Sequence, residues 1–466
     1  MAIDVHAIDG KIHAPDERFD VVVVGAGSAG TAAAIDAVRA GERVLLVDEN
    51  PVPGVLIGTD VPLFFGGRAT SAVQQQGRMV EQLFAANPRL EEAFEAGVDV
   101  RLGTVAWGLY VNGPAMRALP EPVLGIADAD RAQMVGFGRL VLATGARDVV
   151  LGFDGWNQPG VMGTQGFAAL VTRYDAFAGR RVLIVGSDRL GLETALLAAE
   201  HGIEVAGIIE IANGAQGPGE LRDRVETVGI PVFTNTAIAK AAGGADGVEH
   251  VALSDGGEIA CDTIVLAIGV QPATELLSAA DIGPGGSITL IGDCADARPP
   301  TSARLMAWAE ALAGHAPDGT IVCQCEDVTR ADLIGVQPPR YLDRPERMLA
   351  RSLATLAADG PSHPDQIKRL TRAGMGQCQG RRCREQVRCI LAHVDGIPLD
   401  QVPVASFRAP VRPVPLDVLA DGEERADMAA GWDVWFGIPT QWTPYAVIGT
   451  PDEADHVSGL SGNMHV

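Results

Sequence analysis

Short all-apolar runs separated by longer amphipathic stretches mark the first two thirds of the chain. Residues 20–24 and 43–48 contain such runs, at 21–24 and 44–47, with a glycine-rich turn and an alanine-rich stretch between them. An apolar run bounded by turn residues is typical of a strand buried on both faces of a parallel sheet. The pattern therefore predicts a strand, a turn, a helix and a second strand in residues 20–48.

The same pattern occurs a second time. An apolar run at 181–185 precedes a helical stretch that ends near His201 and Gly202, and another run follows at 205–210. Two such units, one nested in the other, are typical of a flavoprotein with two Rossmann-like dinucleotide-binding domains. We therefore predict an α/β fold.

The domain organisation follows from this nesting. We expect a nucleotide-binding domain in residues 1–147 and 273–316, interrupted by an NAD-like domain in residues 148–272. A cysteine-rich domain in residues 317–400 and a proline-rich arm with an aromatic tail in residues 401–466 complete the chain. The tail could dock on a partner or pack on the chain's own surface, and its tryptophans are Trp432, Trp435 and Trp442.

Composition limits the classes of function. The 466 residues carry a formal net charge of −23, which argues against binding to nucleic acid. The first residues show no signal peptide, and no apolar stretch approaches the ~20 residues of a transmembrane helix. Seven cysteines without an export signal indicate reduced thiols or metal ligands. We therefore expect a cytoplasmic protein.

Three glycines lie between the first strand and its helix. Gly25, Gly27 and Gly30 match G-x-G-x-x-G, and Asp48 closes the second strand 18 residues after Gly30. In this pattern the glycines permit a tight turn, close approach of a pyrophosphate and tight helix–strand packing, while the acid binds a ribose. This context disfavours a glycine turn without a ligand. The predicted nucleotide-binding residues are Gly25, Ala26, Gly27, Ser28, Ala29, Gly30, Asp48, Glu49 and Asn50.

The second unit carries an altered glycine loop. Asp188 stands where the middle glycine belongs, between Gly186 and Gly191. A carboxylate there repels a pyrophosphate, and its side chain blocks close approach to the backbone. Although Glu210 could still hold a ribose, we favour a retained fold that no longer binds NAD(P)H. The alternative is a self-contained NAD(P)H-dependent flavoprotein reductase that feeds its own iron–sulfur cluster.

Four cysteines form two close pairs. Cys323 and Cys325 are one residue apart, and Cys378 and Cys383 flank a glycine-containing turn. Four thiolates suit a [2Fe–2S] cluster, and spacing alone leaves structural zinc open. The adjoining flavoprotein pattern favours iron–sulfur, and the arginines around the second pair would stabilise thiolates. We expect the remaining cysteines to be buried structural residues: Cys261, Cys294 and Cys389.

Other chemistry is not indicated. The chain has no Cys-x-x-Cys, which argues against a disulfide reductase, and its histidines show no metal-ligand spacing. No acid, base or nucleophile constellation is evident, so we predict no catalytic residue.

Further strings resemble the glutathione-reductase-like flavoproteins. Residues 140–146 resemble the segment that lies against FAD in that family, which assigns Thr144 and Gly145 to the cofactor site. Residues 290–293 resemble the motif whose aspartate, here Asp293, bonds the ribityl or phosphate region. Val105 lies where that family's backbone meets the adenine.

Residues 371–383, 323–329 and 406–413 together resemble a narrower family. It comprises the alpha-type subunits of heteromeric amine dehydrogenases: opine oxidases, dye-linked proline and hydroxyproline dehydrogenases, and hydrogen cyanide synthase. The resemblance covers about residues 18–416 and implies a small helical [2Fe–2S] domain like bacterioferritin-associated ferredoxin. The interval between the cysteine pairs is long, which predicts an inserted helical element around 341–358.

The resemblance also implies a division of labour. A separate beta subunit of the amino-acid-oxidase-like family would bind FAD and oxidise a secondary amine, opine or amino acid. The alpha subunit would carry an adenine nucleotide site, help hold an interfacial FMN and pass electrons to the cluster or an external acceptor. A small third subunit is compatible with it. Relatives differ in whether the alpha nucleotide site holds FAD, NAD or ATP, and the glycine loop does not distinguish them.

Overall fold

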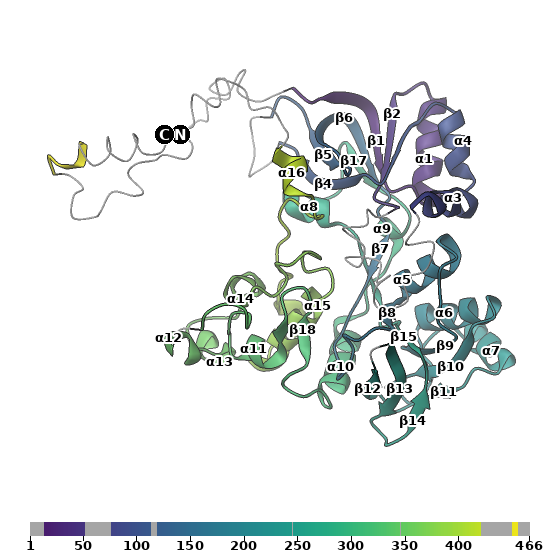
Figure 1. Ribbon diagram of the computed structural model, residues 1–466, viewed down its shortest axis with the longest axis vertical. Coiled ribbons are helices and arrows are strands. Elements are labelled where there is room, and N and C mark those ends of the chain that lie inside the picture. The colour runs from purple at the N-terminus through teal and green to yellow at the C-terminus, as the bar shows by residue number, and fades with distance from the viewer. Residues whose placement is uncertain are drawn as a thin grey trace.

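The computed structural model describes residues 14–51, 76–112, 119–244, 246–344, 346–420 and 450–454. Figure 1 shows three parts: a first sheet with its helices at the top, a second sheet at the lower right and a helical cysteine region at the lower left. The tail tryptophans predicted to dock or pack lie outside the described residues.

A seven-stranded sheet forms the first part. Its strands run in the order β3-β2-β1-β6-β5-β4, and β17 also pairs with β6. The pairings among β1, β2, β3, β6 and β17 are parallel, whereas β4, β5 and β6 form an antiparallel meander. The strands are β1 (Glu17–Val24), β2 (Val44–Asp48), β3 (Asp99–Leu102), β4 (Val105–Tyr110), β5 (Val123–Ala127), β6 (Ala132–Leu142) and β17 (Ile288–Leu290).

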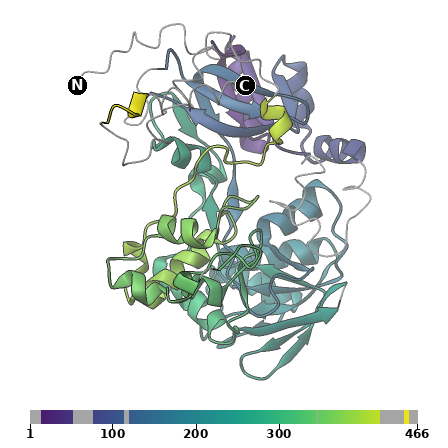
Figure 2. The ribbon, with the colours of Figure 1, turned by 60° about the vertical axis from the view of Figure 1, so that its left-hand side comes forward.

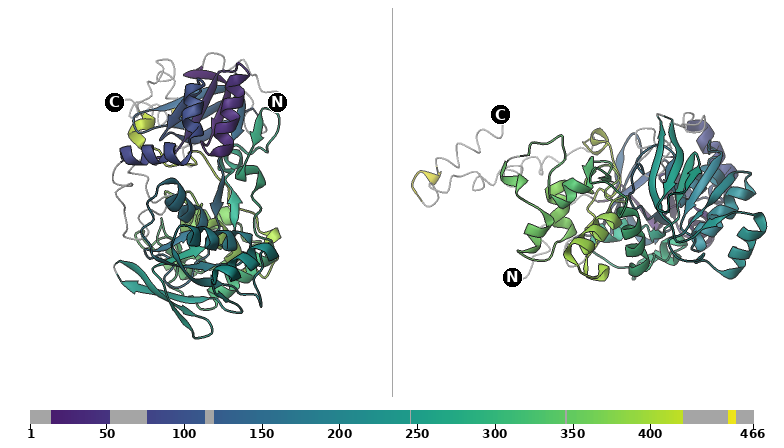
Figure 3. Two further views of the ribbon diagram at one scale, coloured as in Figure 1. Left: turned by 90° about the vertical axis from the view of Figure 1, so that its right-hand side faces the viewer. Right: turned by 90° about the horizontal axis from the view of Figure 1, so that it is seen from below.

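Burial on both faces explains the run of four valines that the sequence shows at 21–24. Val22 and Val24 pack into one core cluster, and Val21 and Val23 pack into another on the opposite face. Successive side chains of a strand point to opposite faces, so both faces must be covered. Helices α1 and α4 cover one face (Figure 3). The helices of this part are α1 (Ser28–Arg39), α3 (Gln76–Ala86), α4 (Arg89–Glu95), α8 (Glu275–Ala280) and α9 (Asp293–Asp296).

The second part repeats the design. Its five-stranded sheet has the order β11-β10-β9-β15-β8, and every pairing in it is parallel. A separate antiparallel sheet, β12-β13-β14, projects from it (Figure 3). The elements are β8 (Val161–Gly163), α5 (Thr164–Ala168), π-helix η3 (Ala169–Arg173), β9 (Arg181–Val185), α6 (Arg189–Glu200), β10 (Glu204–Ile209), α7 (Gly219–Val228), β11 (Val232–Phe233), β12 (Ile238–Gly244), β13 (Gly247–Leu253), β14 (Glu258–Ala260) and β15 (Thr263–Leu266).

Two chain crossings join these parts. Strand β7 (Ala146–Asp148) leads into the second part, and β16 (Val270–Pro272) leads back. The two strands pair antiparallel, with Asp148 opposite Val270 and Ala146 opposite Pro272. The domain boundaries expected at 148 and 272 fall in this ribbon.

The cysteine region is mainly helical. Its hairpin, β18 (Ile321–Cys323) with β19 (Val328–Thr329), packs with the helices in one core that includes Trp308, Val251 and Leu391. Helices α12 and α13 occupy the interval in which an inserted helical element is expected. The helices are α10 (Ser302–Ala313), α11 (Arg330–Ile334), α12 (Glu346–Leu349), α13 (Leu353–Ala357), α14 (Pro364–Thr371), α15 (Arg384–Asp395) and the 3₁₀ turn η4 (Leu399–Gln401).

An extended arm returns the chain from the cysteine region to the first sheet. The backbone N–H of Val411 donates to the carbonyl of Trp107 in β4 at 2.8 Å, and Val418 packs on Val105. The arm ends in α16 (Leu416–Ala420), which lies beside the first sheet in Figure 2. Among the described residues, no helix has the length and apolar character needed to cross a membrane.

Candidate functional site: a nucleotide cavity beside a cysteine cluster

The first glycine loop has the geometry that its pattern predicts. Gly25 has φ +106°, a conformation that side chains rarely adopt, and a Cβ on Gly30 would lie 1.8 Å from the carbonyl oxygen of Gly25. A Cβ on Gly27 would meet nothing within 4 Å. The first and third glycines are therefore required by the fold, whereas the second leaves open space in front of the backbone.

The acid at the end of β2 is held by its own chain. Asp48 accepts hydrogen bonds from the backbone N–H of Ala26 at 2.5 Å and from both nitrogens of Asn50 at 2.8 Å. The hydroxyl of Tyr174 in turn donates to the side chain of Asn50. These contacts fix the carboxylate beside the glycine loop.

A cavity of about 540 Å³ runs past this loop. Among the predicted cofactor residues, the side chains of Ala26 and Val105 are buried in the core instead of lining the cavity. Thr104, the neighbour of Val105, does line it. The predicted residues on its wall are Gly25, Gly27, Ser28, Ala29, Gly30, Asp48, Glu49, Asn50, Thr144, Gly145 and Asp293.

The structure adds a wall residue that sequence reasoning missed. Arg412, in the C-terminal arm, lines the cavity and its Nε lies 2.8 Å from the Oε2 of Glu49. The partners are 363 residues apart, so no local pattern could have linked them.

A buried thiol supports the middle of the cavity. The Thr144 hydroxyl donates to the carbonyl of Ala273 at 2.6 Å and lies 3.1 Å from the Sγ of Cys294. Burial raises the pKa of the Cys294 thiol, which keeps it protonated at neutral pH. Cys294 is therefore a structural residue, as are Cys261 and Cys389, whose pKa values burial raises to about 12.

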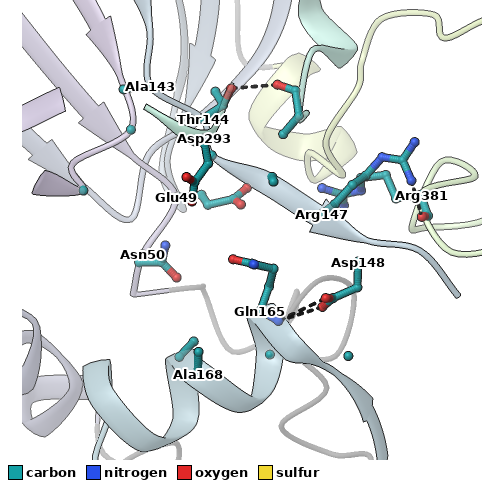
Figure 4. Close-up of a pocket in the computed structure, with 18 of the residues that line it drawn as sticks. Glu49, Asn50, Ala143, Thr144, Arg147, Asp148, Gln165, Ala168, Asp293 and Arg381 are labelled. Carbon is teal, nitrogen blue, oxygen red and sulfur yellow. Dashed lines mark hydrogen bonds between the residues drawn. The ribbon is translucent and has the colours of Figure 1, made fainter. Parts of the chain in front are cut away.

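The far end of the cavity is charged (Figure 4). Asp148 accepts hydrogen bonds from the Thr164 hydroxyl at 2.7 Å and from the backbone N–H of Gln165. Burial raises the pKa of Asp148, against the effect of these hydrogen bonds. Arg147 also lines this end, together with residues that belong to the cysteine region: Arg381 and Arg382.

The four predicted ligand cysteines lie in that region as two pairs. Cys383 pairs with Cys323 and Cys325 pairs with Cys378, and the two thiols of each pair share a side-chain hydrogen bond. The backbone N–H of Gly374 lies 3.4 Å from the sulfur of Cys323. Three of the four side chains are buried and Cys325 is exposed.

Within each pair, the pKa of one thiol is lowered and the pKa of the other is raised. The hydrogen bond from Cys325 lowers the pKa of Cys378 to about 5, with smaller help from Arg382 and Arg381. The hydrogen bond from Cys383 lowers the pKa of Cys323, whereas the pKa values of both donor thiols are raised. Each pair therefore carries one sulfur that ionises readily, which favours binding of a metal.

The donor set fits a thiolate-bound group. In the described part of the chain, no three or more His, Cys, Asp or Glu side chains form a preformed metal centre. The two cysteine pairs face each other closely enough for the charges of the other three cysteines to influence Cys383. An N–H donor to sulfur and nearby arginines suit an iron–sulfur cluster, whose potential such contacts set. Four thiolates also remain compatible with zinc.

In the second glycine loop, a salt bridge from Arg304 occupies the acidic groups. Glu210 is fully buried, and Arg304 from α10 holds both of its carboxylate oxygens at 2.8 and 2.6 Å. The same guanidinium lies 3.3 Å from Asp188, and the hydroxyl of Ser187 donates to Glu210 at 2.5 Å. The acid that could hold a ribose is thus already paired. Sequence reasoning missed Arg304, which is 94 residues from Glu210.

The fold and these sites define a flavoprotein-type oxidoreductase with two dinucleotide-binding folds. Residues 19–311 match the pyridine nucleotide-disulphide oxidoreductase family, and the chain belongs to that family. Residues 340–423 match the sarcosine oxidase A3 domain.

Several similar proteins are named as subunits of larger enzymes. The A-type component of opine oxidase from Agrobacterium tumefaciens is 26% identical, over 86% of this chain and 91% of the relative. The alpha component of sarcosine oxidase from Rhizobium meliloti is 26% identical, over 86% of this chain and 42% of the relative. The HcnB component of hydrogen cyanide synthase from Pseudomonas aeruginosa is 24% identical, over 83% of this chain and 98% of the relative. The resemblance to this group of proteins is thereby confirmed.

A solved structure supports the fold. The crystal structure of L-proline dehydrogenase from P. horikoshii matches with a TM-score of 0.57 and 19% identity, over 88% of this chain and 81% of that chain. The predicted fold class, an α/β protein of nested Rossmann-like units, is confirmed.

Proposed function

We propose that the chain is the electron-transfer alpha subunit of a heteromeric flavin-dependent dehydrogenase. One observation carries this proposal: Arg381 and Arg382, which lie between two cluster cysteines, line the same cavity as the first glycine loop. A nucleotide in that cavity and a metal group at the cysteines would share a wall of the protein. Such an arrangement suits electron transfer within one chain.

The donor would be a secondary amine, opine or amino acid, oxidised on a partner. The relatives support this class, since they include opine and sarcosine oxidases. The sequence predicts no acid–base or nucleophile constellation, so we assign substrate oxidation to an FAD-containing beta subunit. The complex would lie in the cytoplasm, an external molecule would accept the electrons, and a small third subunit is compatible with this assembly.

The chain's own residues would hold three groups. The glycine loop with Asp48, Thr144, Gly145 and Asp293 would bind FAD or another ADP-containing nucleotide. An FMN would lie at the interface with the beta subunit. A [2Fe–2S] cluster would be ligated by Cys323, Cys325, Cys378 and Cys383, and when bound it would accept one electron at a time.

These residues have defined tasks in binding. Open space before Gly27 admits a pyrophosphate, and the N–H groups at the start of α1 offer it hydrogen bonds. Burial excludes water from three of the four thiols, and the pKa of Cys378 is lowered by its hydrogen bond with Cys325 and, to a smaller extent, by Arg382 and Arg381. The salt bridge between Glu210 and Arg304 disfavours the alternative of a self-contained NAD(P)H reductase, because it pairs the acid that would bind the ribose.

The test is an anaerobic visible spectrum of the purified chain, recorded before and after NADH, together with metal analysis. We expect iron, acid-labile sulfide and cluster absorbance that NADH leaves unchanged. Bleaching of flavin and cluster bands by NADH would establish the reductase instead. Zinc without sulfide would overturn the electron-transfer role, and robust amine oxidation by the isolated chain would overturn the partner requirement.

A further inference from the structure

A largely buried arginine joins three elements at the far end of the cavity. Arg147, in β7, holds both carboxylate oxygens of Glu385 at 2.6 and 3.0 Å, and its Nε lies 3.1 Å from Glu275. The two acid side chains are 4% and 3% exposed, and Arg147 is 16% exposed. Glu275 belongs to α8 and Glu385 to α15. Such a network of buried charges is rigid, because separating any member leaves an unpaired buried charge.

The same arginine contacts the cysteine site. Its Nη1 donates to the carbonyl of Arg381 at 3.0 Å, and Arg381 lies between Cys378 and Cys383 in the chain. Glu385 follows Cys383 by two residues. Arg147 therefore contacts this segment on both sides of Cys383, at Arg381 and at Glu385.

The contact extends to the first cysteine pair. Arg382, the next residue along this segment, donates to the side-chain oxygen of Gln324 at 3.1 Å. Gln324 lies between Cys323 and Cys325. One chain of direct contacts thus runs from Arg147 to the segments that carry all four cysteines.

Arg147 also lines the nucleotide cavity, three residues after Thr144 (Figure 4). An anionic group in the cavity would attract the guanidinium and compete with Glu385 for it. Because the surroundings are buried, that competition is strong and barely screened by salt. A neutral side chain, or one without five donors in a fixed plane, could not bond both acids and the carbonyl at once.

We propose that Arg147 is a positioning residue that couples the occupant of the nucleotide cavity to the cysteine site. The coupling rests on the proposed function for its two sites and adds a connection between them. A nucleotide that attracts the guanidinium of Arg147 weakens the contacts of Arg147 with residues 381–385. A metal that fixes those residues in turn changes the affinity of the cavity for the nucleotide. By linkage, both effects have the same size.

The experiment measures ADP binding by titration calorimetry, with the chain as purified and again after its metal is removed by a chelator. We expect the two dissociation constants to differ by about fivefold or more, the usual range of such coupling. In Glu385→Gln we expect the two constants to agree, because the variant keeps the shape but loses the charge that ties Arg147 to α15.

Glu275→Gln is the matched control. It removes the other buried carboxylate from Arg147 but leaves the cysteine segment untouched, so its ratio of dissociation constants should match wild type. A role in stability alone would lower the melting temperature and would leave the wild-type ratio in Glu385→Gln. That result would overturn the coupling, as would a wild-type ratio of one.

If the Glu385→Gln variant fails to fold, a second measurement on wild type tests the same coupling. In metal-free wild type, labelling rates of the four cysteines are compared with and without ADP by peptide mass spectrometry. We expect ADP to change the rates of Cys378 and Cys383 and to leave Cys261 unchanged. Unchanged rates with ADP bound would overturn the coupling while the proposed electron transfer stands. Absence of any ADP binding would overturn both the nucleotide site and the coupling.

Discussion

At the scale of single residues, the three glycines of the first loop have different physical tasks. Gly25 needs its positive φ, and Gly30 has no room for a methyl group. Gly27 differs because the space in front of it is empty. Substitution at this position therefore separates binding from folding.

Gly27→Ala is expected to leave the melting temperature within a degree or two of wild type and to weaken ADP binding about tenfold or more, because the methyl group crowds the pyrophosphate. Calorimetric titration with ADP and a thermal melt measure the two effects. Gly214→Ala is the control, since a Cβ at that position also meets nothing within 4 Å and lies away from the cavity. Full ADP affinity in Gly27→Ala would show that no phosphate approaches this loop.

Glu210 gives a residue-scale prediction on pH. Burial alone would raise its pKa, but hydrogen bonds from Arg304 and Ser187 outweigh it, and the pKa is lowered. A carboxyl group with a lowered pKa stabilises the fold above its unfolded pKa, and that contribution disappears as pH falls through the folded pKa. Glu210→Gln should therefore cost about 2 kcal/mol of stability at pH 7.

The measurement is the free energy of unfolding of both proteins, from urea titrations between pH 7 and pH 3. The difference between them should persist at pH 6 and disappear below the folded pKa of Glu210. Asp223→Asn, which changes an exposed acid on α7, is the control variant. A difference that stays constant down to pH 3 would contradict a charged Glu210.

At the scale of elements, α15 carries two kinds of cysteine. Cys383 directly precedes its first residue and pairs with Cys323, whereas Cys389 lies within the helix, buried, with a pKa raised by burial. The two thiols are six residues apart in the sequence but have different surroundings. This contrast provides an internal control for metal binding.

Cys383→Ser is expected to remove most of the bound metal, because one of four thiolates is lost. Cys389→Ser should retain it, although burial of a hydroxyl lowers the melting temperature modestly. Iron and sulfide are determined on both purified proteins. Equal metal content in the two variants would reject Cys383 as a ligand.

Elements also show what the sequence could predict. The β1–α1–β2 unit was predictable because its determinants lie within 20–48: apolar strands buried on two faces, and glycines at positions where a Cβ would clash. The contacts of Arg147, Arg304 and Arg412 were not predictable. Each pairs with an acid 94 to 363 residues away, and only the packing of α10, α15 and the arm brings the charges together.

At the scale of the whole molecule, the C-terminal arm connects the cysteine region back to the first sheet. It leaves the cysteine region near Ser406, where Asp365 accepts two hydrogen bonds at 2.9 Å, and reaches Glu49 through Arg412. The nucleotide cavity is therefore bounded by residues from the first sheet, the second part, the cysteine region and the arm.

Arg412→Ala is expected to weaken ADP binding by about three- to tenfold, since it removes one side chain from the wall of the cavity and leaves Glu49 without this ion pair. Arg408→Ala, at an exposed position of the same arm, should bind ADP as wild type does. Equilibrium dialysis with labelled ADP distinguishes the two variants. Equal affinity in both would place the nucleotide away from the arm.

The arm also sets an order in time. Domains generally fold from the N-terminus as the chain is synthesised, and the glycine loop is made hundreds of residues before Arg412. Arg412 leaves the ribosome much later, so the nascent first domain has an open cavity until the cysteine region and the arm have been translated. Tight binding of a nucleotide is then a late step in biogenesis, because it requires a chain whose cysteine region has already been translated.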